Sequence, residues 1–146
     1  MVVWTDIDSH ITKPSFSCLR SASEWQKVWR VHKGCSSDDG LCPPTPDVDF
    51  DSYMVIALFN GPYAQDLGLS IDSVDNEKDA IRLRFERNVY AVGGEPMRPK
   101  TTYDYAFVVV PKSKKAIVIQ ERVLKERAEP PEKGVWRERA RIEPAK

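Results

Sequence analysis

A run of alternating aspartates after a loop is the first feature of the sequence that could carry chemistry. Asp47, Asp49 and Asp51 alternate with other residues, like the first half of a calcium-binding EF-hand loop. The second half is missing, because Ser52 stands where the turn glycine belongs and Leu58 where the bidentate glutamate belongs. We therefore expect a solvated acidic loop and no metal site.

The histidines and cysteines form no recognisable catalytic or zinc pattern. His10 and His32 have no cysteine or carboxylate partners at zinc-site spacing, so His32 is expected to be a packed helix residue. No local signature makes Cys18, Cys35 or Cys42 a nucleophile. Cys35 and Cys42 flank a Ser/Asp/Gly loop, and they either close it as a disulfide in an oxidising compartment or stay free thiols.

Nucleotide, cofactor and nucleic-acid signatures are also absent or weak. Gly93-Gly94 is a lone glycine pair that lacks the other glycines of a phosphate-binding loop. Arg82 and Arg84 hint at a basic strand face, but Glu86 follows them. The 22 basic and 22 acidic residues give zero formal net charge, which argues against a nucleic-acid partner. We predict no cofactor, no metal and no catalytic residue.

One helix is expected near the N-terminus. Ser21 and Glu24 have the spacing of a capping box. Side chains that share one helical face follow it: Trp25, Val28, Trp29 and His32. Gly34 stands where a helix C-terminal glycine belongs. Because two tryptophans lie on that face, the helix should pack on an apolar surface.

The rest of the chain is predicted to form strands. After a loop over residues 35–46, strand-like runs separated by turns occupy residues 53–59, 67–73, 81–86, 103–110 and 116–120, with an edge strand at 16–19. Asn60-Gly61-Pro62 is expected to end the first run. The short turn at 111–115 predicts a hairpin. The fold class is therefore α+β: a single antiparallel sheet of about five or six strands with the short helix packed on it.

The length of 146 residues fits one domain. We assign residues 1–121 to a single α+β domain and residues 122–146 to a charged C-terminal extension. Pro130-Pro131 breaks any continuous helix there. Trp136, Ala140 and Ile142 fall on one side of an alternating stretch, so the extension is either a final strand, an extended segment packed on the domain, or a flexible tail.

The order of these motifs resembles a known family. The segments that carry the resemblance are Ser23-Glu24-Trp25 with Trp29 and His32, Pro46-Asp47-Val48-Asp49-Phe50, Met54 to Gly61, and Pro111-Lys112-Ser113. Over residues 9–120 the chain is similar to the PrcB-like domains, named for a protein that stabilises a bacterial surface protease complex. That family often has a Gly-Gly-Tyr stretch after the central strand, whereas Gly61-Pro62-Tyr63 keeps only the tyrosine.

The resemblance implies a noncatalytic module that binds or stabilises another protein, such as a protease or a complex subunit. Two aromatic residues, Tyr63 and Trp136, are the predicted partner-binding residues, with ordinary packing as the alternative for both. The competing function is a small-molecule or carbohydrate-binding domain, or a small hydrolase that uses loop carboxylates. No nucleic-acid partner is expected, and no apolar run approaches the roughly 18–20 residues of a membrane span.

The compartment depends on the N-terminus. Met1-Val2-Val3-Trp4 is followed by Asp6 and Asp8, with no basic segment and no apolar core of a signal peptide. As it stands, the sequence predicts a cytoplasmic protein; it would be an exported protein if a signal peptide had been removed. Members of the family that it resembles usually look exported.

Overall fold

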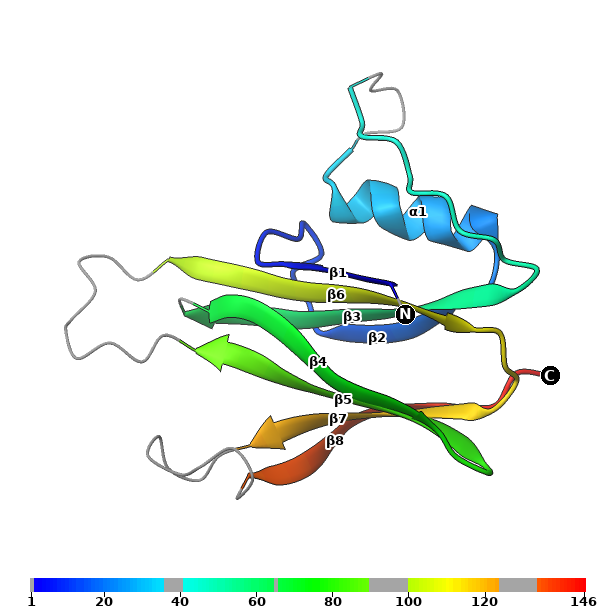
Figure 1. The fold of residues 1–146 in the computed structure, drawn as a ribbon. Coiled ribbons are helices and arrows are strands. Elements are labelled where there is room, and N and C mark those ends of the chain that lie inside the picture. The colour runs from blue at the N-terminus through cyan, green and yellow to red at the C-terminus, as the bar shows by residue number, and fades with distance from the viewer. Residues whose placement is uncertain (1, 36–40, 65, 90–99, 124–133) are drawn as a thin grey trace. The chain divides into compact units, whose positions relative to one another are not determined.

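The computed structural model describes residues 2–35, 41–64, 66–89, 100–123 and 134–146 (Figure 1). In chain order its elements are β1 (Val2–Asp6), β2 (Ser15–Leu19), α1 (Ala22–His32), β3 (Tyr53–Ala64), β4 (Asp66–Asn76), β5 (Ala80–Val89), β6 (Thr101–Pro111), β7 (Ala116–Val123) and β8 (Val135–Ile142). The described residues are therefore rich in β-strands and contain one helix, as the sequence predicts. Strand β1 has no counterpart among the predicted elements.

The strands form two sheets, so the prediction of a single sheet of five or six strands is wrong. The first has the order β1-β6-β3-β2 and the second the order β4-β5-β7-β8. In the first sheet β3 and β6 pair with each other, and β2 and β1 occupy their outer edges. Neither central strand has an edge left for the strand that follows it in the sequence. The hairpin predicted across residues 111–115 therefore does not form.

The chain folds into two compact units, each built from two separate stretches of the sequence. The first consists of residues 1–68 and 89–113, and the second of residues 69–88 and 114–146. Strand β7 runs across the predicted boundary after residue 121, and residues 135–142 form β8. The chain thus passes from one unit to the other three times, within β4, near the end of β5, and in the short connection between β6 and β7.

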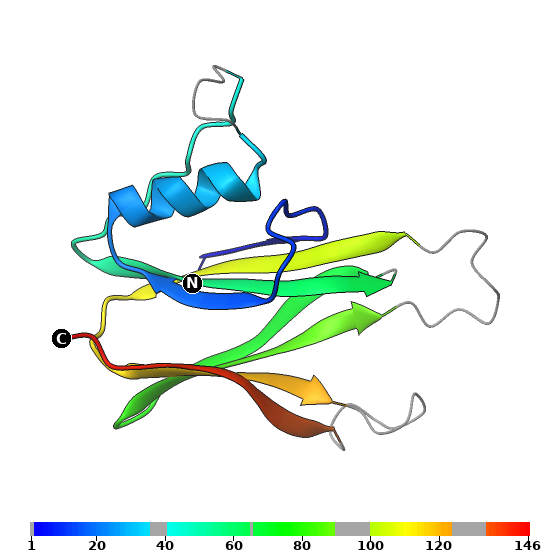
Figure 2. The same ribbon diagram turned by 180° about the vertical axis from the view of Figure 1, so that it is seen from behind.

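Helix α1 covers one face of the first sheet (Figures 1 and 2). Ser21 caps it, because its Oγ accepts the Glu24 N–H at 3.2 Å and donates to the Glu24 carboxylate at 3.0 Å. The predicted apolar face is confirmed, since Trp25, Trp29 and His32 are buried. Gly34 follows with a φ of +71°, the left-handed conformation that ends helices.

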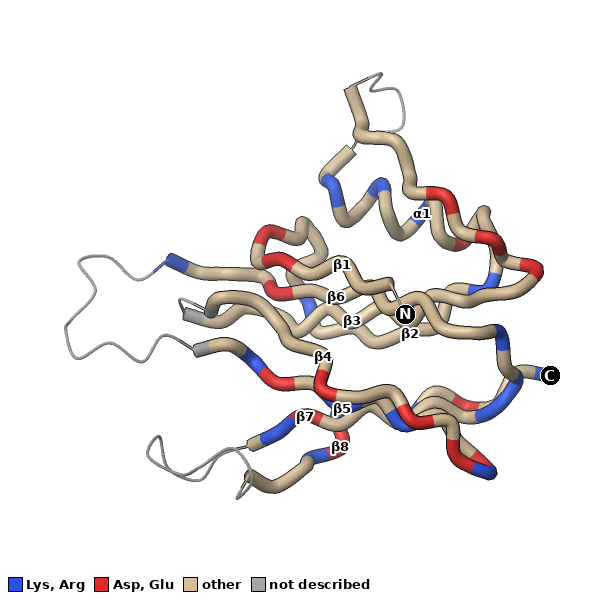
Figure 3. Tube along the Cα trace, in the orientation of Figure 1, with Lys and Arg blue, Asp and Glu red and all other residues tan. Residues whose placement is uncertain are grey.

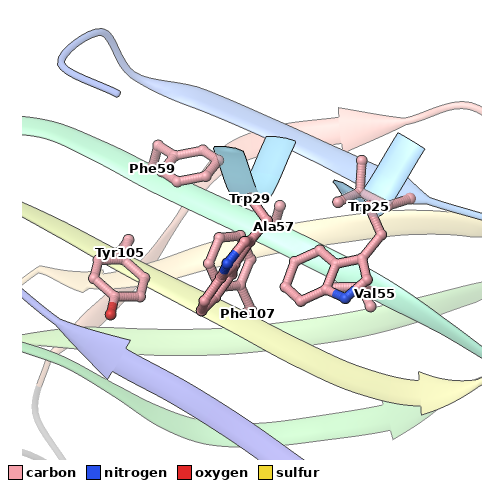
Figure 4. Close-up of a cluster of buried hydrophobic side chains, with 8 residues drawn as sticks. Trp25, Trp29, Val55, Ala57, Phe59, Tyr105 and Phe107 are labelled. Atoms are coloured by element: carbon pink, nitrogen blue, oxygen red, sulfur yellow. The ribbon is translucent and has the colours of Figure 1, made fainter. Parts of the chain in front are cut away.

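Aromatic rings make up the core between α1 and the sheet (Figure 4). Trp25 is 2% exposed and meets Phe107 edge to face, with the ring centroids 4.8 Å apart. The same cluster contains Leu19 of β2 and residues of alternating position on β3 and β6: Val55, Ala57, Phe59, Tyr105 and Phe107. This core explains why a helix of 11 residues is stable here.

The segment after α1 that carries Cys42, Pro43 and Pro46, which we call the strap, lies against the indoles of Trp25 and Trp29. Cys35 and Cys42 form a disulfide, which decides between the two alternatives left open by the sequence. Beyond the disulfide, two carbonyl groups of the strap accept hydrogen bonds from the indoles. The Trp29 indole N–H donates to the Pro43 carbonyl at 3.2 Å, and the Trp25 indole N–H donates to the Pro46 carbonyl at 2.8 Å. The disulfide therefore tethers the segment that accepts the two indole N–H groups of the core.

Strand β3 continues past the point where the sequence predicts its end. Gly61 has a φ of +80°, and the pairing with β6 shifts between Phe59 and Pro62 before it resumes. A Cβ atom at Gly61 would lie 2.8 Å from Pro14 Cγ. Gly61 therefore forms a bulge that redirects the strand instead of ending it.

The second unit shows the expected alternation along β5. Leu83 and Phe85 are fully buried, whereas Arg84 and Glu86 between and after them are partly exposed. Strand β7 pairs with β5 in parallel, contrary to the all-antiparallel prediction. Parallel pairing needs a long connection, and the segment between these strands, which contains β6 in the first unit, supplies it.

Candidate functional site: the charged sheet face around Trp136

Three strands of the second unit place polar side chains on one sheet face. In the parallel β5–β7 pair Arg84 lies opposite Gln120, and in the antiparallel β7–β8 pair Arg122 lies opposite Trp136. Since side chains alternate between faces, Gln120 and Arg122 share one face of β7. Arg84, Gln120, Arg122 and Trp136 therefore form one group, which we call the Trp136 face.

Two guanidinium groups hold the indole of Trp136. The Arg84 Cζ atom lies 4.8 Å from the ring centroid and the Arg122 Cζ atom 4.7 Å from it. Cation–π contacts of this kind contribute about 0.5–2 kcal/mol each, depending on how far they are desolvated. Trp136 stays partly exposed. The ring is thus positioned by the fold while part of its surface stays in contact with solvent.

The two arginines of the Trp136 face have different partners. Arg122 forms ion pairs with Asp72 Oδ1 at 3.2 Å and Glu86 Oε2 at 3.3 Å. Arg84 instead donates its Nε–H to Gln120 Oε1 at 2.9 Å. Within the part of the chain that the structure describes, no carboxylate pairs with Arg84.

The surroundings of this face carry charges of both signs (Figure 3). Arg82 pairs with Glu77 at 3.1 Å and Arg141 with Glu138 at 2.9 Å. All four side chains are between 37% and 52% exposed, so these pairs contribute little stability. Charges of both signs therefore alternate around the Trp136 face.

The opposite face of the same sheet contains a buried carboxylate. Glu121 has a side chain only 6% exposed, and it contacts Arg87, Arg137 and Arg139. A bulge in β8 leaves Arg139 outside the register, between Glu138 opposite Gln120 and Ala140 opposite Ile119. The bulge brings a second arginine of β8 to the carboxylate.

That bulge also corrects the predicted grouping of the C-terminal segment. Trp136 pairs with Arg122 on the polar face, whereas Ala140 and Ile142 pair with Ile119 and Ile117 on the buried face. The sequence placed Trp136, Ala140 and Ile142 on one side, because alternation was assumed to continue without interruption. One extra residue in a strand moves all later side chains of that strand to the opposite face of the sheet.

The first unit contains a serine–histidine pair that the sequence did not indicate. Ser9 Oγ lies 2.8 Å from His32 Nδ1, and the residues are 3% and 1% exposed. Burial lowers the pKa of His32 to about 4, with smaller contributions from Lys33 and His10, so the imidazole is neutral near pH 7. Because both groups are enclosed, the pair stabilises the core and is not placed to attack a substrate.

The other sequence candidates have local structural roles. The Asp49 carboxylate accepts the Asp51 N–H at 3.1 Å, which stabilises the turn before β3. Among the described residues, no three metal-ligand side chains converge. Burial raises the pKa of the Cys18 thiol, which disfavours a reactive thiolate. Gly93 and Gly94 lie outside the described residues.

The two predicted partner-binding residues belong to different units. Trp136 is on β8, and Tyr63 lies near the end of β3, where its carbonyl accepts the Thr102 hydroxyl at 3.3 Å. Sequence reasoning missed the roles of Gln120 and Arg122. Their alternation with Ile119 and Glu121 was visible, but the strands beside them could not be known. The described residues contain no helix that could span a membrane.

Comparison of the chain with protein-family models, with curated proteins and with solved structures finds no match.

Proposed function

We propose that the chain is a noncatalytic protein-interaction or stabilising module and that the Trp136 face meets the partner. The observation that carries the proposal is the partly exposed indole held by Arg84 and Arg122. Tryptophan and arginine are the residues most enriched at the energetic centres of protein interfaces. The resemblance to PrcB-like domains supports the same function, with a protease or another complex subunit as the partner.

The environments of the Ser9–His32 pair and of Glu121 support a noncatalytic role. Ser9 and His32 are enclosed in the aromatic core, and Glu121 is shared by three arginines. A general acid or base must reach the proton that it transfers. Each of these groups instead satisfies a neighbour within the fold.

The proposal is tested by capture from an extract of the organism that encodes the protein. Immobilised wild-type protein should enrich a specific protein, and Trp136→Ala should reduce that enrichment by about tenfold, because a truncated interface centre loses at least that much affinity. Val31→Ala, an exposed position on α1, is the control that should capture like the wild type. Equal enrichment by the wild type and Trp136→Ala would refute the proposal, as would no specific protein at all.

A carbohydrate ligand is the second candidate. An aromatic ring beside Gln120 and the Asp72 and Glu86 carboxylates has the composition of a sugar-binding surface. The two guanidinium groups over the ring weigh against it, because they occupy area on which a sugar would stack. If a glycan competes with the captured protein for wild-type binding, the carbohydrate alternative gains; if no glycan competes, the protein partner stands.

The disulfide supports an oxidising compartment for this module. Structural disulfides persist mainly in exported proteins. Protein isolated from its native source, alkylated under denaturing conditions without reductant, should gain one alkyl group, at Cys18, because Cys35 and Cys42 are joined. Three alkyl groups would place the protein in a reducing compartment.

A further inference from the structure

Arg84 differs from the arginines around it in what it binds. On the Trp136 face and its margins, each of the other arginines has a carboxylate partner: Arg82 with Glu77, Arg122 with Asp72 and Glu86, and Arg141 with Glu138. On the opposite face Glu121 serves Arg87, Arg137 and Arg139. Among the described arginines of this sheet, Arg84 is the one whose described partners, Gln120 and Trp136, are both uncharged.

The two neutral partners orient the guanidinium. Gln120 accepts its Nε–H at 2.9 Å, and the Trp136 ring lies 4.8 Å from its central carbon. An amide acceptor at Nε fixes one edge of the planar group, and the ring limits how that plane can turn. Arg84 is also partly buried in the centre of the sheet face, so it has lost some of its hydration. An oriented, partly desolvated guanidinium without a counter-charge favours binding of an anion.

We infer that Arg84 binds a carboxylate of the partner protein, an inference that rests on the proposed function. The Nη groups present the parallel N–H pair that matches the two oxygens of an aspartate or glutamate side chain. The bound carboxylate would supply the counter-charge that the described residues do not, and the Trp136 ring beside it would contact the apolar part of the same side chain.

The surrounding charges favour a single carboxylate over a polyanion. Asp72 and Glu86 flank the arginines of this face, and Glu138 follows Trp136 on β8. A nucleic-acid backbone would bring several phosphates toward these carboxylates and be repelled. A protein surface can place one acidic residue at Arg84 and basic or neutral residues over the acids.

The test uses a short peptide of alternating glycine and glutamate, acetylated and amidated at its ends, with the glutamine version as control. In NMR titrations of the full chain, the glutamate peptide should shift the Arg84 Nε–H and Trp136 indole N–H signals to saturation, and the glutamine peptide should not. Arg84→Gln should abolish binding, and Arg84→Lys should weaken it by about tenfold, because lysine lacks the paired donors. Arg82→Gln is the matched control that should bind normally.

Three outcomes would overturn the inference: equal shifts with both peptides, unchanged binding by Arg84→Gln, or saturation of the same signals by a single-stranded oligonucleotide at lower concentration. Capture from extract separates this failure from that of the proposed function. If Trp136→Ala loses the captured protein and Arg84→Gln keeps it, the interaction module stands and the carboxylate inference fails. If Trp136→Ala keeps it, both fail.

Discussion

The two units of this protein differ in the side chains that lie on the faces of their sheets. In the first, α1 covers the sheet with aromatic rings, and the enclosed Ser9 hydroxyl lies within hydrogen-bond distance of the His32 Nδ1 atom. In the second, guanidinium groups lie on both faces, around the buried Glu121 on one and over Trp136 on the other. A helix-covered face has no side chains left for a partner, whereas the Trp136 face is polar, ordered and partly exposed.

The largest effect should come from the aromatic core of the first unit. Trp25→Ala removes a ring that contacts Trp4, Trp29 and Phe107 and should lower the free energy of unfolding by about 4 kcal/mol. Urea unfolding followed by far-UV circular dichroism measures this change. Val31→Ala, at a 58% exposed position of the same helix, should change stability by less than about 0.5 kcal/mol. A loss below about 1 kcal/mol for Trp25→Ala would contradict an α1-centred core.

The buried histidine should make the first unit sensitive to acid. Its pKa falls from 6.5 to about 4 on folding, so the unfolded chain binds more protons than the folded chain between these values. Stability from His32 is complete above pH 6.5 and is lost as the pH falls toward 4, by about 2–3 kcal/mol in total. Urea unfolding across this range should show the loss in the wild type and in the His10→Gln control. If His32→Gln loses the same amount, another group is responsible.

The second unit should depend on charge instead. Glu121→Gln keeps the shape of the side chain but leaves three guanidinium groups without their shared carboxylate, which should cost about 2 kcal/mol. Chloride should partly offset the loss, because screening weakens repulsion between the arginines. Unfolding of the variant and the wild type at low and high salt measures both effects. An unchanged stability would show that the buried carboxylate is dispensable.

The smallest effect should come from the exposed charges of the same unit. Glu138→Gln removes the partner of Arg141 from a pair that is 45% and 52% exposed and should change stability by about 0.3 kcal/mol. Thermal unfolding beside Glu121→Gln measures it, with the wild type as reference. A cost as large as that of Glu121→Gln would remove the distinction between buried and exposed charge in this sheet.

The parts of the fold that depend on local pattern were predictable. Ser21, Glu24 and the spacing of Trp25, Trp29 and His32 define α1, because a helix is closed by contacts between residues three or four apart. Period-two alternation likewise identified β5 and its wet face. Both signals lie within a few residues of each other, so a single sequence contains them.

Strand pairing was not predictable in the same way. The short turn at 111–115 favoured a hairpin, yet β6 already had β1 and β3 as neighbours. Which strands pair with β6 depends on contacts between residues far apart in the sequence. The β8 bulge is a similar case, because the register shift at Arg139 places Ala140 and Ile142 on the face opposite Trp136. The candidate site was therefore visible in the sequence only as Trp136 and as the hint of a basic strand face at Arg82 and Arg84.

The sequence by itself determined the helix, the alternation of most strands, the β-rich class and the choice of Trp136 as a notable residue, because each rests on neighbours along the chain. Only the tertiary structure decided that there are two sheets, that Cys35 joins Cys42, and that Arg84 of β5 and Arg122 of β7 meet at the Trp136 ring of β8. These depend on hydrogen-bond partners and charges brought together from distant segments, and no local pattern encodes which distant segment arrives.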